Sequence, residues 1–172
     1  GGIDLSVGSL VALTGVLVAL FMKSGLVVPL AIIVVLVISS LIGFTHGLFV
    51  TKLNVPPFII TLGTLTAARG LASAITKGWP IIGLPESFFF IGQGQIIGIP
   101  FPLIILLFFA AIAFFVTRYT VLGRQLYATG GNIEAARLSG VDVDKRRMFA
   151  YIFNSFLAGI TGIILASRLS QG

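Results

Sequence analysis

The 172-residue chain is 57% hydrophobic and 9% charged, with 11 basic and 5 acidic side chains and no cysteine. A soluble globular domain averages about 45–50% apolar and about 25% charged residues, so this composition argues against a water-soluble enzyme and against a disordered tail. The lack of cysteine excludes disulfides, thiol catalysis and thiolate zinc sites. The remaining class is an integral membrane protein.

Long uncharged runs predict helices that cross the bilayer. The longest runs cover residues 5–22, 24–51, 87–117 and 148–167. A bilayer core about 30 Å thick needs about 20 residues of helix, so each run is long enough for a span. Because period-two alternation is absent from these runs, we predict an all-α fold, a polytopic transmembrane helix bundle.

Five spans fit the chain, at about 5–22, 27–50, 55–76, 101–117 and 148–167. In the third span we expect Asn54 to act as the N-cap, with Pro56 and Pro57 in the first turn, where a missing N–H costs little. Residues 77–100 contain several glycines and prolines, which predict an irregular segment outside the membrane.

The lysines and arginines predict the orientation of these spans. One side of the membrane holds most of them: Lys52, Arg118, Arg124, Arg137, Lys145, Arg146 and Arg147. The other side holds only Lys23, Lys77 and Arg168. The positive-inside rule therefore places the 118–147 loop in the cytoplasm and the 77–100 segment outside. The net charge of +6 reports this topology and gives no reason to expect nucleic-acid binding.

Small residues recur at helical spacing within two of the spans. They are Ser39, Gly43 and Gly47 in the second span, and Ser155, Gly159, Gly162 and Ala166 in the last. Such stripes let two helix backbones approach closely, so they predict tight packing between helices.

A few polar side chains fall inside the predicted spans, where each needs a partner. Asp4 and Ser6 are good N-cap residues for the first span, and the alternative is that they face a cavity. Thr61 and Thr64 either bond back to their own helix or line a polar path with Arg69, which alternatively extends outward to the external interface. His46 is interpreted as a packed side chain rather than a ligand.

The cytoplasmic loop predicts a short helix. Residues 129–132 read as a turn in which Asn132 is the N-cap, residues 133–138 favour helix, and Gly140 is a typical C-terminal glycine. Asp142 or Asp144 is expected to cap the last span. The short helix is either a plain connector or a docking element for a cytoplasmic partner.

Three ordered segments resemble a known family. Residues 1–9 (GGIDLSVGS) look like the hallmark of the ribose/xylose/galactoside-type permeases of bacterial ABC importers. Residues 55–64 (VPPFIITLGT) are similar to a second signature, and a third lies in 122–124 (LGR), 127–132 (YATGGN) and 135–141 (AARLSGV). The likeness covers nearly the whole chain, and with its abrupt start it implies that residues 1–172 are a fragment of a single transmembrane permease domain.

The resemblance implies a subunit of the bacterial cytoplasmic (inner) membrane that moves a monosaccharide such as ribose inward. It implies three partners: a cytoplasmic ABC ATPase, a periplasmic or lipid-anchored sugar-binding protein, and a second permease copy. ATP and Mg²⁺ would be used by the ATPase, with no cofactor bound by this chain. The implied ATPase-coupling residues are Gly130, Gly131, Asn132, Glu134, Ala135, Ala136, Arg137 and Gly140. The expected translocation path is Asp4, Ser6, Thr61, Thr64 and Arg69.

Two other function classes fit the sequence less well. A secondary transporter or channel for a small polar solute is the alternative, but the spans hold few ionisable groups for a proton relay. A membrane-embedded enzyme is disfavoured, because no nucleophile with a base, no metal-ligand set and no phosphate-binding glycine loop is present in the sequence.

Overall fold

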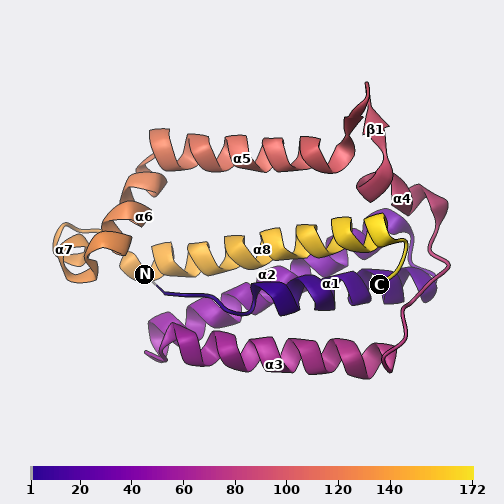
Figure 1. The fold of residues 1–172 in the computed structure, drawn as a ribbon. Coiled ribbons are helices and arrows are strands. Elements are labelled where there is room, and N and C mark those ends of the chain that lie inside the picture. Colours follow the sequence, from indigo (N-terminus) through magenta and orange to yellow (C-terminus); the bar gives the residue numbers. More distant parts are fainter. Residues whose placement is uncertain (1) are drawn as a thin grey trace.

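Helices build nearly all of the protein in a computed structural model that describes residues 2–172 (Figure 1). The order is α1 (Val7–Lys23), α2 (Val28–Lys52), α3 (Pro57–Thr76), α4 (Glu86–Gln93), β1 (Gln95–Ile96), β2 (Ile99–Pro100), α5 (Phe101–Tyr119), α6 (Val121–Gly131), α7 (Ile133–Leu138) and α8 (Val143–Leu169). The predicted all-α, polytopic bundle is confirmed.

Four helices, α2, α3, α5 and α8, are long and apolar enough to cross a membrane. The shorter α1 is an apolar helix of 17 residues, or about 26 Å at about 1.5 Å per residue, and the extended residues 2–6 precede it. These five helices run alternately in opposite directions (Figure 1). They correspond to the five predicted spans, and α8 begins at Val143, directly after the predicted cap Asp142.

The centre of the bundle is α8, which packs most extensively on α2 and then on α1. The small-residue stripes make this packing close, as expected. A Cβ atom added at Gly43 would lie 2.5 Å from the carbonyl oxygen of Tyr151 on α8, and one added at Gly47 would lie 2.9 Å from Met148 Cα. Only glycine fits at these two positions without moving the helices apart.

The fifth helix stands apart from the others. It lies along one side of the bundle (Figure 1), and none of its residues is buried. It is held mainly at its ends, by α4 and β2 on one side and by α6 on the other. The long flank of α5 is therefore open to lipid or to another protein surface.

The segment 77–100, predicted as irregular, contains regular structure. It holds α4 and a two-stranded antiparallel hairpin in which Ile96 pairs with Ile99. Phe88 on α4 is fully buried, and Ser167 Oγ near the end of α8 accepts from the Gly92 N–H at 2.7 Å and donates to the Phe88 carbonyl at 2.6 Å. The glycines end α4 and form the hairpin turn rather than preventing order.

Two local predictions were wrong. Asn54 does not cap α3, because the helix begins after Pro56 and Asn54 adopts a left-handed φ of 51° outside it. Residues 129–131, predicted as a turn, are the last residues of α6. The start of α6 is marked by Thr120, whose side chain accepts from the Gly123 N–H, a cap that sequence reasoning overlooked.

Candidate translocation and coupling sites

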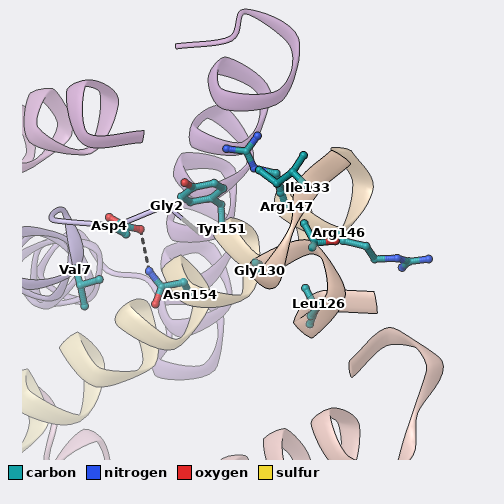
Figure 2. A pocket seen from close by; sticks show the side chains of 12 residues that line it. Gly2, Asp4, Val7, Leu126, Gly130, Ile133, Arg146, Arg147, Tyr151 and Asn154 are labelled. Carbon is teal, nitrogen blue, oxygen red and sulfur yellow. Dashed lines mark hydrogen bonds between the residues drawn. The ribbon is translucent and has the colours of Figure 1, made fainter. Parts of the chain in front are cut away.

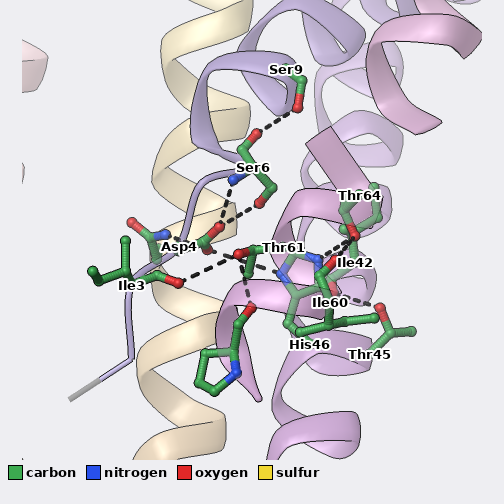
Figure 3. Close-up of polar contacts among 12 residues, drawn as sticks. Ile3, Asp4, Ser6, Ser9, Ile42, Thr45, His46, Ile60, Thr61 and Thr64 are labelled. Carbon is green, nitrogen blue, oxygen red and sulfur yellow. Dashed lines mark hydrogen bonds and ion pairs between the residues drawn. The ribbon is translucent and has the colours of Figure 1, made fainter. Parts of the chain in front are cut away.

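Asp4 is the centre of a polar cluster where four parts of the chain meet (Figure 3). Its Oδ1 accepts from the Ser6 N–H at 2.9 Å and from the Ser6 hydroxyl at 2.6 Å. Its Oδ2 accepts from Asn154 Nδ2 on α8 at 2.8 Å. Ser6 occupies the N-cap position of α1 without a side-chain cap bond, so it is Asp4 that binds the free N–H there. Asp4 thus joins the start of α1 to α8.

His46 on α2 lies beside this carboxylate. Its ring is fully buried, with Nε2 at 2.8 Å from Thr64 Oγ1 on α3 and Nδ1 at 4.0 Å from Asp4 Oδ2. The Nδ1 atom has no hydrogen-bond partner among residues 2–172. His46 is a packed side chain, as interpreted from sequence, and it extends the Asp4 cluster to α2 and α3.

The threonines of α3 bond back to their own helix. Thr61 Oγ1 donates to the Pro57 carbonyl at 2.9 Å, and Thr64 Oγ1 lies 3.0 Å from the Ile60 carbonyl. Thr61 is fully buried and also reaches the Ile3 carbonyl at 3.4 Å. Its hydroxyl therefore helps to hold residues 2–6 against α3.

Asp4 also lines a cavity of about 460 Å³ (Figure 2). The cavity lies between residues 2–7, α6, the start of α7 and the first turns of α8. Its polar walls are formed by Asp4, Thr129, Arg146, Arg147, Tyr151 and Asn154. At its edge Gly2 lies against the Tyr151 hydroxyl and Pro57, with no room for a Cβ atom. The carboxylate of Asp4, the amide of Asn154 and the phenol of Tyr151 can bond hydroxyl groups of a ligand. The guanidinium group of Arg146 points away from these three side chains (Figure 2).

The other predicted path residues do not line this cavity. Ser6 and Thr61 are fully buried, and Thr64 faces His46. Arg69 is exposed in the second half of α3, and no ion pair or hydrogen bond of its side chain occurs within the described part of the chain. The structure brings Asp4, Ser6, Thr61 and Thr64 into one cluster and leaves Arg69 apart.

The short helix α7 forms as predicted, over residues 133–138. Asn132 accepts from the Ala135 N–H at 3.0 Å, and Gly140 ends the helix with a φ of 79°. Ala136 is the one buried residue of α7, whereas Leu138 is 90% exposed. The helix therefore packs on the protein through Ala136 and the half-buried Ile133, and its other residues are exposed.

Charged side chains hold α7 to its neighbours. Asp144 lies 3.3 Å from Arg137 on α7 and 3.7 Å from Lys52 at the end of α2. Asp142 caps α8 by accepting from the Lys145 N–H at 3.1 Å, and the hydrogen bond from the Lys145 side chain keeps the pKa of Asp142 below its ordinary value. All these pairs are at least partly exposed, so each contributes little to stability. Of these pairs, only Arg137–Asp144 links α7 directly to α8.

Sequence reasoning missed Asn154 and Tyr151 as site residues. The hydrogen bond between Asn154 and Asp4 joins residues 150 positions apart, so no short motif predicts it. Asn154 does lie inside an otherwise apolar run, and a buried amide needs a partner, which was the available signal. Among residues 2–172 no cluster of three His, Asp or Glu side chains has the arrangement of a metal site.

Comparison with known proteins gives a consistent picture. A family model described as "Branched-chain amino acid transport system / permease component" matches residues 1–171. The chain is 42% identical to the ribose import permease of Haemophilus influenzae, over 99% of this chain and 54% of that protein. It is 37% identical to the autoinducer 2 import system permease of an Enterobacter species, over 97% of this chain and 49% of that protein. It is 36% identical to the D-allose transport system permease of Escherichia coli, over 98% and 52%.

The chain spans about half the length of the curated relatives it matches. No solved structure matched it.

Proposed function

The chain belongs to the family of branched-chain amino acid transport system permease components, and we propose that it forms part of the permease of an ABC importer for a monosaccharide such as ribose. Its apolar helices and its permease relatives make it a multi-pass protein of the bacterial cytoplasmic (inner) membrane. The relatives named for ribose and D-allose import support a sugar as the substrate class.

The proposed energy source is a separate cytoplasmic ABC ATPase that docks on α7. The exposed helix itself carries this proposal: α7 projects its outer face, including Leu138, on the side where lysines and arginines gather. ATP and Mg²⁺ are used by the ATPase, and this chain supplies no catalytic group. An external sugar-binding protein delivers the substrate, and a second permease copy completes the transmembrane unit.

Movement of α7 would pass directly to α8. Gly140 and the Asp142 cap leave a short turn between the two helices, and the Arg137–Asp144 pair crosses that turn. Because α8 packs closely on α2 and α1, these three helices would move together and change the opening around them. Each conformational state must then bind substrate or ATPase with a different free energy.

The proposed path for the sugar includes the cavity beside Asp4. A carboxylate accepts hydrogen bonds from sugar hydroxyls, and an amide both donates to them and accepts from them. Asp4 and Asn154, which bond to each other, supply these two groups beside the cavity. The predicted path also includes four residues that do not line the cavity: Ser6, Thr61, Thr64 and Arg69.

The experiment that tests this function measures uptake of radiolabelled ribose and allose by cells that express the full-length protein with its neighbouring transport genes. Gly140→Val should abolish uptake and co-purification of the ATPase while the membrane level stays normal, because valine is strained at a φ of 79°. Gly63→Ala is the control, since Gly63 lies on α3 outside the coupling loop, is exposed, has an ordinary φ and has space for a Cβ.

Normal uptake by Gly140→Val would contradict the docking role of α7. If no ATPase co-purifies with the wild-type protein in mild detergent while uptake persists, the chain belongs to a secondary transporter or channel.

A further inference from the structure

The β1–β2 hairpin carries a concentration of exposed apolar side chains on a strained turn. Its two-residue loop is Ile97-Gly98, with φ values of 52° and 76°, and Ile96 pairs with Ile99 across it. Positive φ at both loop positions is the type I′ turn, for which Asn-Gly is the preferred sequence. A β-branched residue is strongly disfavoured in this conformation. Ile97 is nonetheless there, and its side chain is 96% exposed.

Folding does not explain this isoleucine. Asparagine at the same position would relieve the backbone strain, and Ile97 contacts nothing that would compensate it, given its exposure. The neighbouring Ile96 and Ile99 are exposed as well. An apolar tip on a turn that would prefer a polar residue indicates selection for a contact outside the chain.

The depth of the hairpin is fixed by α5. The Phe101 N–H, at the first residue of α5, donates to the Gly94 carbonyl at 2.8 Å and closes the base of the hairpin. The rings of Phe90 on α4 and Phe101 lie 5.2 Å apart between centroids. Since α5 is a candidate span that begins directly after β2, the hairpin lies at the level where α5 leaves the membrane.

The direction of the hairpin is across the helix axes. Figure 1 shows it projecting beyond α5 on the side away from α8. That side is the open flank, because no residue of α5 is buried. Residues 87–117, which include the whole hairpin and most of α5, carry no charged side chain that would hold this surface in water.

We propose that the tip formed by Ile96, Ile97 and Ile99 inserts into the boundary between lipid headgroups and acyl chains, at the external face of the membrane. Uncharged apolar side chains are stable at this depth, and hydrated headgroups can still bond the free backbone groups on the two outer edges of the hairpin. The tip holds the external end of α5 in the lipid interface, near the Ser167 hydrogen bonds that join α4 to α8.

A site-directed fluorescence experiment tests the insertion. The 172 residues contain no cysteine. With any cysteine elsewhere in the full-length protein replaced by serine, Ile97→Cys carries a single environment-sensitive nitrobenzoxadiazole label, and the protein is reconstituted in phosphatidylcholine/phosphatidylglycerol vesicles. We expect quenching by lipids with a nitroxide near the headgroup to exceed, several-fold, quenching by aqueous iodide. Ser139→Cys, at the exposed end of α7, is the control and should show the reverse order.

Two results of this experiment overturn the proposal. Iodide quenching at Ile97→Cys as strong as at Ser139→Cys would place the tip in water. Protection from both quenchers would place it against protein, either a second copy or another part of the transporter.

A second variant separates a lipid contact from a role in the turn. With the label on Ile99→Cys, the change Ile97→Asn should lower lipid quenching several-fold, although asparagine suits the turn better than isoleucine. Unchanged lipid quenching in that variant would show that the side chain of Ile97 does not hold the hairpin in the interface.

Discussion

Asn154 donates a 2.8 Å hydrogen bond to Asp4 and thereby ties the middle of the last helix to the start of the first. Within residues 2–172, this is the only side-chain hydrogen bond that joins residues 2–6 to α8. The Asp4 carboxylate is nearly buried, so the pairing matters more than an exposed one would.

Replacing Asn154 with alanine should lower the stability of the protein in detergent by about 1–3 kcal/mol, because Asp4 Oδ2 then loses its donor. The measurement is the thermal unfolding midpoint of the purified protein. The double variant Asp4→Ala/Asn154→Ala should lose less than the sum of the two single changes. Additive losses would show that the bond contributes nothing of its own.

Gly43→Ala should disrupt the packing between α2 and α8, since its Cβ would meet the Tyr151 carbonyl oxygen at 2.5 Å. We expect a loss of about 1–3 kcal/mol in stability, as for other overpacked cores. Gly63→Ala on α3 is the control, because nothing lies within 4 Å of its added Cβ. That change should be neutral or should stabilise by about 0.5–1 kcal/mol. Equal effects at both positions would contradict close packing at Gly43.

Leu138→Ala should weaken co-purification of the ATPase without changing membrane level or folding, because this side chain projects from α7 into water and packs on nothing in the chain. If the contact is apolar and central, truncation of leucine to alanine should cost binding about ten-fold or more. Leu53→Ala is the matched control, an exposed leucine at the end of α2. A similar loss in both variants would indicate a general effect on the membrane-facing surface.

Asp142→Ala should loosen the start of α8, whereas Asp142→Asn should keep the cap and lose only the ion pair with Lys145. The pKa of Asp142 is lowered from 3.8 in the folded protein. The contribution of its charge is therefore present above about pH 4 and is lost as the pH falls through the lower, folded value. Hydrogen exchange of the first turn of α8 at pH 7 and at acidic pH measures this. Identical exchange in the wild type and in Asp142→Ala would show that the Asp142 cap does not stabilise the start of α8.

The spans were predictable because hydropathy and length act locally, and the prolines at the starts of α2, α3 and α5 reinforce them. The α7 cap at Asn132 and the Asp142 cap were predictable for the same reason. The position of α4 was not predictable, since α4 is held by Ser167, more than 70 residues away in sequence. The hairpin was missed because its turn is Ile97-Gly98 instead of a typical turn sequence such as Asn-Gly. The cluster around Asp4 was predictable only in part: the polar residues were identified from their apolar surroundings, but their partners on α2 and α8 come from tertiary packing.

The last helix, α8, connects the two ends of the bundle. Its 27 residues extend for about 40 Å without a break, from the turn after α7 to the Ser167 bonds that hold α4. No proline interrupts it, and atoms of α1 and α2 pack directly against its glycines, Gly159 and Gly162. The helix therefore contains no hinge of the usual kind. If an ATPase docks on α7 as proposed, a tilt of the α7 end of α8 would therefore also displace α4, which Ser167 holds at the other end.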